Sequence, residues 1–168
     1  MKKIGIIGAM ELEVEELKSQ MEEVCVKEKA SMEFYQGTLN GKEVVVVRSG
    51  IGKVNAAVCT QILVDDFQAE AVINTGIAGS LKAEINIGDI VVSTDALQHD
   101  MDAREFGYPK GQIPQMKEFS FQADECLRKI AHDVCAEVNP EIQVFEGRIA
   151  SGDQFVCDQG VKDNIVKE

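Results

Sequence analysis

The chain has 168 residues, of which 45% are apolar and 27% charged, a composition typical of one soluble globular domain. Its 29 acidic and 17 basic residues give a net charge of −12, which argues against non-specific binding to nucleic acid or to an anionic membrane. No stretch has membrane-spanning length and no leader pattern opens the chain, so we expect a cytoplasmic protein.

The first predicted element is a strand over residues 4–7, because its three isoleucines suit a strand that is buried on both faces. Gly8 and Ala9 follow with almost no side chain, so backbone and ligand could approach closely. A helix is predicted over residues 11–23, with apolar residues at helical spacing. A strand, a turn of small residues and a helix N-terminus form the usual ligand crevice of an open α/β sheet.

The turn differs from a phosphate site, because the G-x-G-x-x-G pattern fails at its third glycine. Glu11 and Glu13 open the predicted helix, and their charges would repel phosphate. Acids in a first helical turn also complement the helix dipole, which is the simpler reading of the spacing. A carboxylate at a strand end would alternatively act as a general base on water.

Two further strands are predicted over residues 33–38 and 42–48, joined at Asn40-Gly41, a strong signal for a two-residue hairpin. The valines of the second strand indicate that it crosses the interior of the sheet. S-G-I-G-K-V-N-A-A follows and leads into a helix that ends near Asp66. Another buried strand, residues 71–74, precedes T-G-I-A-G-S. Three strand ends followed by small residues favour loops that converge on one crevice.

The second half begins with a strand over residues 88–93 and a segment without periodicity over residues 95–117, which is typical of a lid, an interface or disorder. A helix over residues 119–138 and a strand over residues 144–150 follow. After S-G-D-Q-F-V the sequence begins a helix that has no C-cap by residue 168. We therefore expect that a C-terminal part is missing.

The cysteines are odd in number and lack C-x-x-C spacing: Cys25, Cys59, Cys126, Cys135 and Cys157. This pattern indicates reduced, mostly buried thiols and not a disulfide framework or a zinc site. His99 and His132 have no partner at metal-ligand spacing, so we expect no metal, and His132 is expected at a surface or boundary position and not in a catalytic role. Lys53 in G-K-V does not complete a P-loop.

Six motifs together resemble one family: I-G-I-I-G-A-M-E-x-E, S-G-I-G-K-V-N-A-A, N-T-G-I-A-G, G-D-I-V-V-S, F-G-Y-x-x-G-Q-I-P and S-G-D-Q-F-V. They are similar to the bacterial 5′-methylthioadenosine/S-adenosylhomocysteine nucleosidases of the nucleoside phosphorylase fold. The resemblance implies a three-layer αβα sandwich with a central mixed sheet, formed by residues 1–168 as a single domain, and a homodimer. It implies hydrolysis of the N-glycosidic bond of both nucleosides, with release of adenine and a 5-thio-substituted ribose. It implies no cofactor and no metal.

The resemblance also assigns roles in the first half of the chain. Glu13 matches the carboxylate that activates the attacking water. Met10 and Ile51 match side chains that line the ribose and thioalkyl side of the pocket, and Gly79 matches a glycine that touches substrate. Many relatives carry serine where this chain has Ile77, so a hydroxyl contact is lost there.

In the second half, Phe155 matches a ring that stacks on adenine, although an aromatic residue after a strand is also typical of a core. Val156 matches a residue whose backbone addresses the purine edge. Phe106 and Pro114 match the segment that reaches across the dimer to the 5′-substituent pocket of the partner. Asp153 is the nearest carboxylate on a matched loop, and we expect it to be structural.

Three functions therefore remain open: a hydrolase, a phosphate-dependent phosphorylase of the same fold, and a non-catalytic nucleoside-binding module. In the resembled family the acid that protonates adenine and the glutamate that binds the ribose hydroxyls would fall beyond residue 168. Because general acid catalysis contributes about 10²–10⁴-fold, we expect residues 1–168 alone to have little activity. Substrate preference between the two nucleosides is not encoded in any of these motifs.

Overall fold

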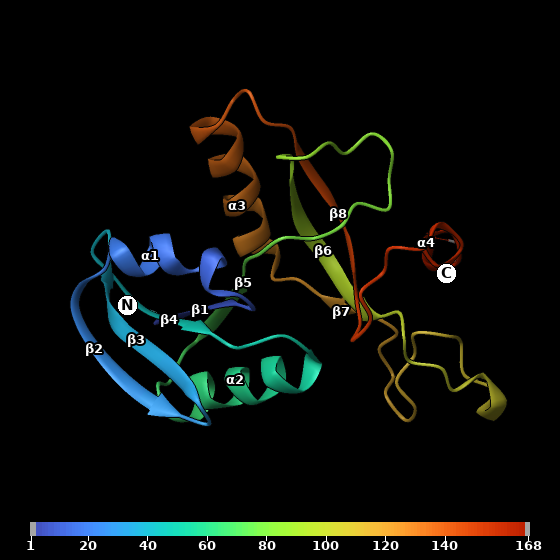
Figure 1. The fold of residues 1–168 in the computed structure, drawn as a ribbon, viewed down its shortest axis with the longest axis horizontal. Coiled ribbons are helices and arrows are strands. Elements are labelled where there is room, and N and C mark those ends of the chain that lie inside the picture. The colour runs from blue at the N-terminus through green and yellow to red at the C-terminus, as the bar shows by residue number, and fades with distance from the viewer. Residues whose placement is uncertain (1–2, 167–168) are drawn as a thin grey trace. The chain divides into compact units, whose positions relative to one another are not determined.

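A computed structural model describes residues 3–166 of the chain, which divide into two compact units at Ala78 and Gly79 (Figure 1). The first unit is built on a five-stranded sheet of order β2-β3-β4-β1-β5. Its strands are β1 (Ile4–Gly8), β2 (Glu22–Lys29), β3 (Met32–Leu39), β4 (Lys42–Arg48) and β5 (Ala71–Asn74). The expectation that residues 1–168 form a single domain stays a prediction.

The sheet of the first unit is mixed. β1 pairs in parallel with β4 and with β5, whereas β2, β3 and β4 form an antiparallel meander. The hairpin between β3 and β4 is confirmed, and Asn40 and Gly41 have φ values of 49° and 71°. Positive φ at both central residues is the signature of a type I′ turn, which matches the twist of the two strands.

Helices cover both faces of this sheet. The helix α2 (Lys53–Asp65) packs Leu63 and its neighbours against one face, where Ile7 and Val45 point. The short helix α1 (Glu15–Ser19) and the turn before it lie on the other face, where Val14 packs against Val46. Alternate residues of β1 and β4 thus enter two separate apolar clusters, because successive side chains of a strand point to opposite faces. Within this unit the predicted three-layer αβα arrangement is present.

Two details of the first half differ from the sequence prediction. The helix predicted over residues 11–23 is a 3₁₀ turn, η1 (Glu11–Glu13), followed by the five-residue α1, and β2 begins at Glu22. The valines of β2 occupy alternate positions, as in a strand, and β2 pairs with β3. Pairing in the sheet therefore outweighs the helical spacing of the residues that precede β2. The strand β5 was predicted to be buried, but Ile73 is 40% exposed because β5 lies at the edge of its sheet.

The second unit contains a three-stranded sheet of order β7-β6-β8. The strands β6 (Ile90–Gln98) and β8 (Val144–Ser151) are parallel, and β7 (Phe121–Gln122) is antiparallel to β6. Its helices are η2 (Arg104–Phe106), α3 (Glu125–Val138) and α4 (Gln159–Val166). The helix predicted from residue 119 begins at Glu125, because Asp124 caps it by accepting a hydrogen bond from the Leu127 N–H group.

Most of the cysteines do not lie in the core, so the expectation of mostly buried thiols is wrong. Only Cys59 is buried, and Cys25, Cys126 and Cys157 are exposed. Burial of Cys59 in the cluster under α2 raises the pKa of its thiol to about 11. Cys59 lies on the face of α2 that packs against the sheet, together with Ile62 and Leu63.

An ion pair between the buried Asp95 and the exposed Arg148 joins β6 to β8 in the second unit. Asp95 is 5% exposed, and its Oδ2 accepts hydrogen bonds from Arg148 Nε at 2.9 Å and Nη2 at 2.7 Å. The Thr94 hydroxyl donates to Oδ1 at 3.1 Å. Hydrogen bonding from Arg148 holds the pKa of Asp95 below its ordinary value, against the opposite effect of burial.

This pair predicts a specific dependence of stability on pH. Because the folded-state pKa of Asp95 is depressed, its contribution is complete above the unfolded value of about 3.9 and is lost as the pH falls below it. The Asp95→Asn variant should therefore be less stable than the parent at pH 7, and the difference should shrink under acid. Urea unfolding at pH 7 and pH 3 measures it, with Glu137→Gln on α3 as an exposed control. A difference that is constant with pH would contradict the prediction.

Candidate active site

Three parallel strands of the first unit end at one edge of its sheet. β1 lies between β4 and β5, so the turns after Gly8, Arg48 and Asn74 are neighbours. Backbone hydrogen bonds continue past the strands, from Ser49 N–H to the Gly8 carbonyl and from Thr75 N–H to the Ile7 carbonyl, both at 2.9 Å. The predicted convergence of the three glycine-containing turns is therefore confirmed.

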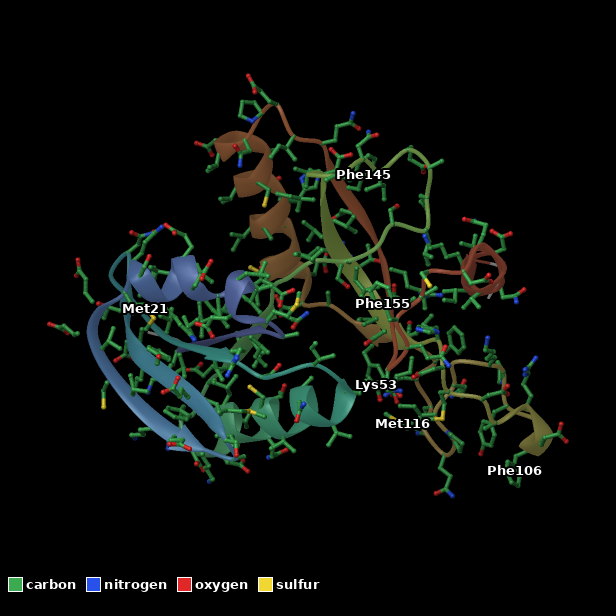
Figure 2. All side chains as sticks on the ribbon, viewed as in Figure 1. Met21, Lys53, Phe106, Met116, Phe145 and Phe155 are labelled. Carbon is green, nitrogen blue, oxygen red and sulfur yellow. The ribbon has the colours of Figure 1, made fainter. Side chains whose placement is uncertain are left out.

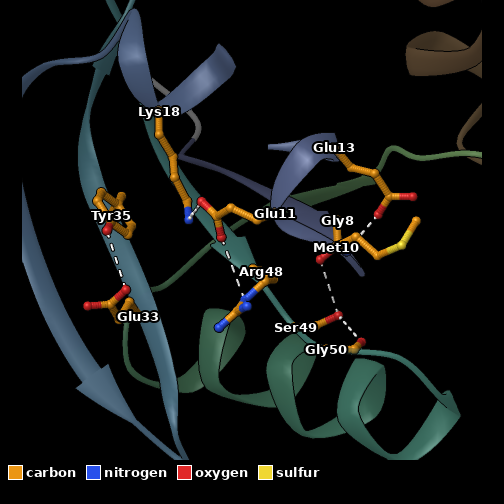
Figure 3. A network of polar contacts seen from close by, with 10 residues as sticks. All are labelled: Gly8, Met10, Glu11, Glu13, Lys18, Glu33, Tyr35, Arg48, Ser49 and Gly50. Atoms are coloured by element: carbon orange, nitrogen blue, oxygen red, sulfur yellow. Dashed lines mark hydrogen bonds and ion pairs between the residues drawn. The ribbon is translucent and has the colours of Figure 1, made fainter. Parts of the chain in front are cut away.

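Glu13 is the carboxylate that lies between two of these turns. The Met10 N–H group donates to Oε2 at 2.8 Å (Figure 3), and the Ile77 N–H group donates to Oε1 at 3.0 Å. Glu13 is half-buried at the last position of η1. Each carboxylate oxygen accepts one backbone hydrogen bond, and a second lone pair on each oxygen can accept a hydrogen bond from water.

Two glycines provide the space that this carboxylate occupies. A Cβ atom at Gly76 would lie 2.6 Å from Glu13 Oε1 and 2.8 Å from its Cδ. A Cβ atom at Gly8 would lie 2.6 Å from Val14 Cγ1 and 3.0 Å from Glu13 Cβ. Carbon atoms do not approach so closely without displacement, so the glycines at both strand ends allow Glu13 to lie against the backbone.

The two acids of η1, which the sequence presents together, have separate surroundings. Glu11 Oε1 accepts a hydrogen bond from Lys18 Nζ at 2.7 Å, and its Oε2 lies 3.6 Å from Arg48 Nε. Glu13, by contrast, accepts hydrogen bonds from the backbone N–H groups of Met10 (Figure 3) and of Ile77. The spacing of the acids did not reveal this division. The one indication in the sequence that Glu11 would form an ion pair was Lys18, a basic residue seven positions after it.

The other predicted residues of the first unit lie at the same edge. Met10 is half-buried beside Glu13, with its N–H group in the contact described above. Ile51 is exposed in the turn after β4, and Ile77 is exposed in the loop after β5. Ser49, directly after β4, is buried, and its hydroxyl donates to the Gly50 carbonyl at 2.9 Å. Sequence reasoning had not singled out Ser49, which ties the ends of β1 and β4 together.

The remaining predicted residues belong to the second unit. Phe155 follows β8 and is 96% exposed, so it does not lie in a core (Figure 2). Val156 is half-buried and lines a hollow of about 350 Å³ together with Phe155. Phe106 ends η2 and is 83% exposed, whereas Pro114 is half-buried in the same loop (Figure 2). Gly79 has open space where a Cβ atom would be.

Two other residues of the second unit were noted in the sequence. His132 is half-buried on α3, with its Nδ1 3.5 Å from the carboxylate of Asp133, as expected for a boundary position. His99 is buried at the end of β6, and a Cβ atom at Gly152 would overlap its ring. His99 therefore packs against the start of the loop that carries Phe155, a contact that the sequence did not indicate.

Between residues 3 and 166, no group of three or more His, Cys, Asp or Glu side chains is arranged to hold a metal ion. In the same range, no helix combines the length and apolar character needed to cross a membrane.

Residues 3–168 match the family model described as the phosphorylase superfamily. A 5′-methylthioadenosine/S-adenosylhomocysteine nucleosidase of Halalkalibacterium halodurans is 46% identical over 165 residues, which cover 98% of this chain and 70% of the relative. A protein with the same name from Bacillus licheniformis is 47% identical over 156 residues, which cover 93% of this chain and 67% of the relative. For a third, from an Exiguobacterium strain, the covered share of the relative is 66%. The chain thus spans about two thirds of the length of these relatives.

Solved structures of nucleosidases with the same name also match this chain. The nucleosidase from Neisseria meningitidis, in complex with methylthio-immucillin-A, superposes with a TM-score of 0.94 and is 41% identical. The match covers 99% of this chain and 71% of that one. The corresponding enzyme from Colwellia psychrerythraea, in complex with adenine, also has a TM-score of 0.94, with 40% identity and coverage of 99% and 68%. These matches confirm the predicted α/β fold class with a central mixed sheet.

Proposed function

Because the chain belongs to the phosphorylase superfamily, and within it to the 5′-methylthioadenosine/S-adenosylhomocysteine nucleosidases, we propose that it hydrolyses the N-glycosidic bond of these two nucleosides. The products are adenine and a ribose that carries the 5-thio substituent. The observation that supports this most directly is the Glu13 carboxylate, fixed by two backbone N–H groups at the meeting point of three strand ends.

In the proposed reaction, a water molecule attacks the anomeric carbon while the bond from that carbon to the adenine nitrogen breaks. The ribose passes through a cation-like transition state, as in other glycosidic cleavages. Glu13 takes a proton from the attacking water and releases it to solvent, while the leaving adenine takes up one proton from solvent, so the net reaction consumes one water. A carboxylate that is anchored on both oxygens requires little reorganisation during this step, which is the condition for an efficient general base.

The same geometry favours water over phosphate as the nucleophile. The N–H groups of Met10 and Ile77 could receive an anion, but both donate to Glu13. A negative charge at that position opposes a second anion, since like charges at close range repel strongly in a partly desolvated site. A phosphorylase needs the opposite arrangement, with N–H groups or cations directed at the phosphate.

The roles of the other site residues are part of this proposal. Met10 and Ile51 line the ribose and thioalkyl side from the edge that holds Glu13, and exposure of Ile51 leaves it available to a ligand. Phe155 stacks on adenine, and the backbone of Val156 addresses the purine edge. The near-complete exposure of the Phe155 ring supports a role in ligand contact, because a core aromatic ring would be covered. Gly79 touches the substrate where a side chain would intrude.

The protein is also proposed to be a homodimer, in which Phe106 and Pro114 of one subunit close the 5′-substituent pocket of the other. The helix α2 buries Cys59, Ile62 and Leu63 on one face. Its opposite face exposes three further apolar side chains: Val54, Val58 and Val64. An exposed apolar stripe of this kind is typical of an interface. A cytoplasmic location is proposed as well, supported by the free thiols of all five cysteines.

Light scattering of the purified protein tests the homodimer. We expect a molar mass twice that of one chain, and Val54→Asp should reduce it to the mass of one chain, because a charge would be placed in the apolar stripe of α2. Glu137→Lys, a charge change at an exposed position of α3 outside this stripe, is the control. A parent protein that is monomeric at micromolar concentration would contradict the homodimer.

The decisive assay for the proposed function follows adenine release from 5′-methylthioadenosine with and without inorganic phosphate. A hydrolase releases adenine at the same rate in both buffers. Strict dependence on phosphate would identify a phosphorylase, and thermal stabilisation by the nucleoside without turnover would identify a binding module. The expectation that residues 1–168 alone turn over slowly stays a prediction, and the same assay measures it.

A further inference from the structure

The turn that carries Glu13 is short and mostly exposed. The 3₁₀ turn η1 contains three residues, and neither Glu11 nor Leu12 is buried in it. Short 3₁₀ segments have poor hydrogen-bond geometry and are easily remodelled. The placement of Glu13 therefore depends on contacts that connect η1 to the more rigid elements around it.

Glu11 provides two such contacts from the same turn. Its Oε1 accepts a hydrogen bond from Lys18 Nζ of α1 at 2.7 Å, and its Oε2 lies 3.6 Å from Arg48 Nε at the end of β4 (Figure 3). The first contact joins η1 to the helix that follows it. The second joins η1 to the central strand beside β1, so one carboxylate bridges both neighbours of the turn.

The Lys18 end of this bridge is well anchored. The Lys18 side chain is only 10% exposed, and its Nζ lies 4.4 Å from the centroid of the Tyr35 ring on β3. A cation over an aromatic face is attracted to it, more strongly when both are partly desolvated. Because an ammonium group on a largely covered side chain is stabilised by a nearby opposite charge, movement of Glu11 away from Lys18 costs free energy. Lys18 thus holds Glu11, and Glu11 holds η1.

We propose that Glu11 is a positioning residue for Glu13: its ion pairs with Lys18 and Arg48 fix η1 so that the Glu13 carboxylate stays between the N–H groups of Met10 and Ile77. Glu11 does not contact the reacting atoms. The expected effect of Glu11 on turnover rests on the proposed role of Glu13 as the base. The expected effect of Glu11 on the position of the Glu13 carboxylate does not rest on that role.

The experiment compares Glu11→Ala, Glu11→Gln and the parent by NMR of the backbone amides at pH 7. The amide protons of Met10 and Ile77 donate to a carboxylate, so we expect both signals to move upfield in Glu11→Ala as those hydrogen bonds lengthen. Glu11→Gln keeps an oxygen for Lys18 and should shift them less. Glu15→Gln, an exposed acid on α1, is the matched control and should leave both signals in place.

Turnover is measured on the same proteins. We expect kcat to fall about 10-fold in Glu11→Ala with KM unchanged, because displacement of a catalytic group by a fraction of an ångström lowers the rate and not the binding. If Glu11→Ala does not fold, Arg48→Met removes the second ion pair without leaving Lys18 unpaired, and it should shift the same two amides.

The outcomes separate the two proposals. Amide signals of Met10 and Ile77 that stay in place in both Glu11→Ala and Arg48→Met would overturn the positioning role of Glu11. Signals that move while kcat stays at the parent value would support the positioning role and contradict the role of Glu13 as the base. Signals that move together with a loss of kcat support both.

Discussion

Replacing Glu13 with glutamine should lower the rate of adenine release about 10²–10⁴-fold, the usual contribution of a general base. The amide has the same shape as the carboxylate but cannot take a proton from water. It also presents an NH₂ group to one of the two backbone N–H donors, so one hydrogen bond of the present arrangement is lost. We expect the loss in kcat, since the proton moves only during reaction.

Steady-state kinetics with 5′-methylthioadenosine measure this effect. Glu16→Gln is the matched control, because Glu16 is an exposed acid on α1 whose Oε1 accepts a hydrogen bond from Gln20 at the surface. Its rate should equal that of the parent. A Glu13→Gln variant that keeps the full rate would remove Glu13 from the mechanism.

A second large effect is expected from one methyl group at Gly76. In Gly76→Ala the new Cβ atom would lie 2.6 Å from Glu13 Oε1, so the carboxylate must move away from the Ile77 N–H group. The backbone at Gly76 does not lie in the left-handed region, so alanine itself is unstrained there. We expect a loss of about 10²-fold in kcat, the scale for misplacement of a catalytic group by about 1 Å.

A double-mutant cycle identifies the cause of that loss. If Gly76→Ala acts through Glu13, the variant with both changes should be no slower than Glu13→Gln alone. The control is Gly41→Ala, at the opposite end of β4, where φ is 71° and no atom lies near the added Cβ. It should cost about 1 kcal/mol of stability with no change in rate. Additive losses in the cycle would contradict the steric explanation.

The parts of the fold that could be predicted from the sequence are those with strong local signals. The isoleucines of β1, the four valines of β4 and the Asn40-Gly41 turn each have one structural interpretation, and all three are confirmed. Leu12, Val14 and Leu17 have helical spacing, yet the segment becomes a 3₁₀ turn and a short helix. There Val14 and Leu17 pack on the sheet without a continuous helix and Leu12 is exposed, so spacing alone was insufficient.

The candidate site could be predicted in part for a similar reason. Glu13 is marked by its place shortly after a strand end, and its carboxylate lies at the edge where the strand-end turns meet, while its role as the base stays a prediction. The bridge from Glu11 to Arg48 and the packing of His99 on Gly152 depend on pairing between distant segments. No local sequence pattern predicts such pairs, because each residue taken alone is of a type that is ordinary at the surface or in a strand.

The most direct test of Glu13-assisted hydrolysis is an isotope experiment in ¹⁸O-labelled water with inorganic phosphate present. Mass spectrometry of the sugar product from 5′-methylthioadenosine should show one labelled oxygen at the anomeric carbon and no phosphate ester. A sugar phosphate as the product, with its anomeric oxygen derived from phosphate, would contradict the proposed reaction.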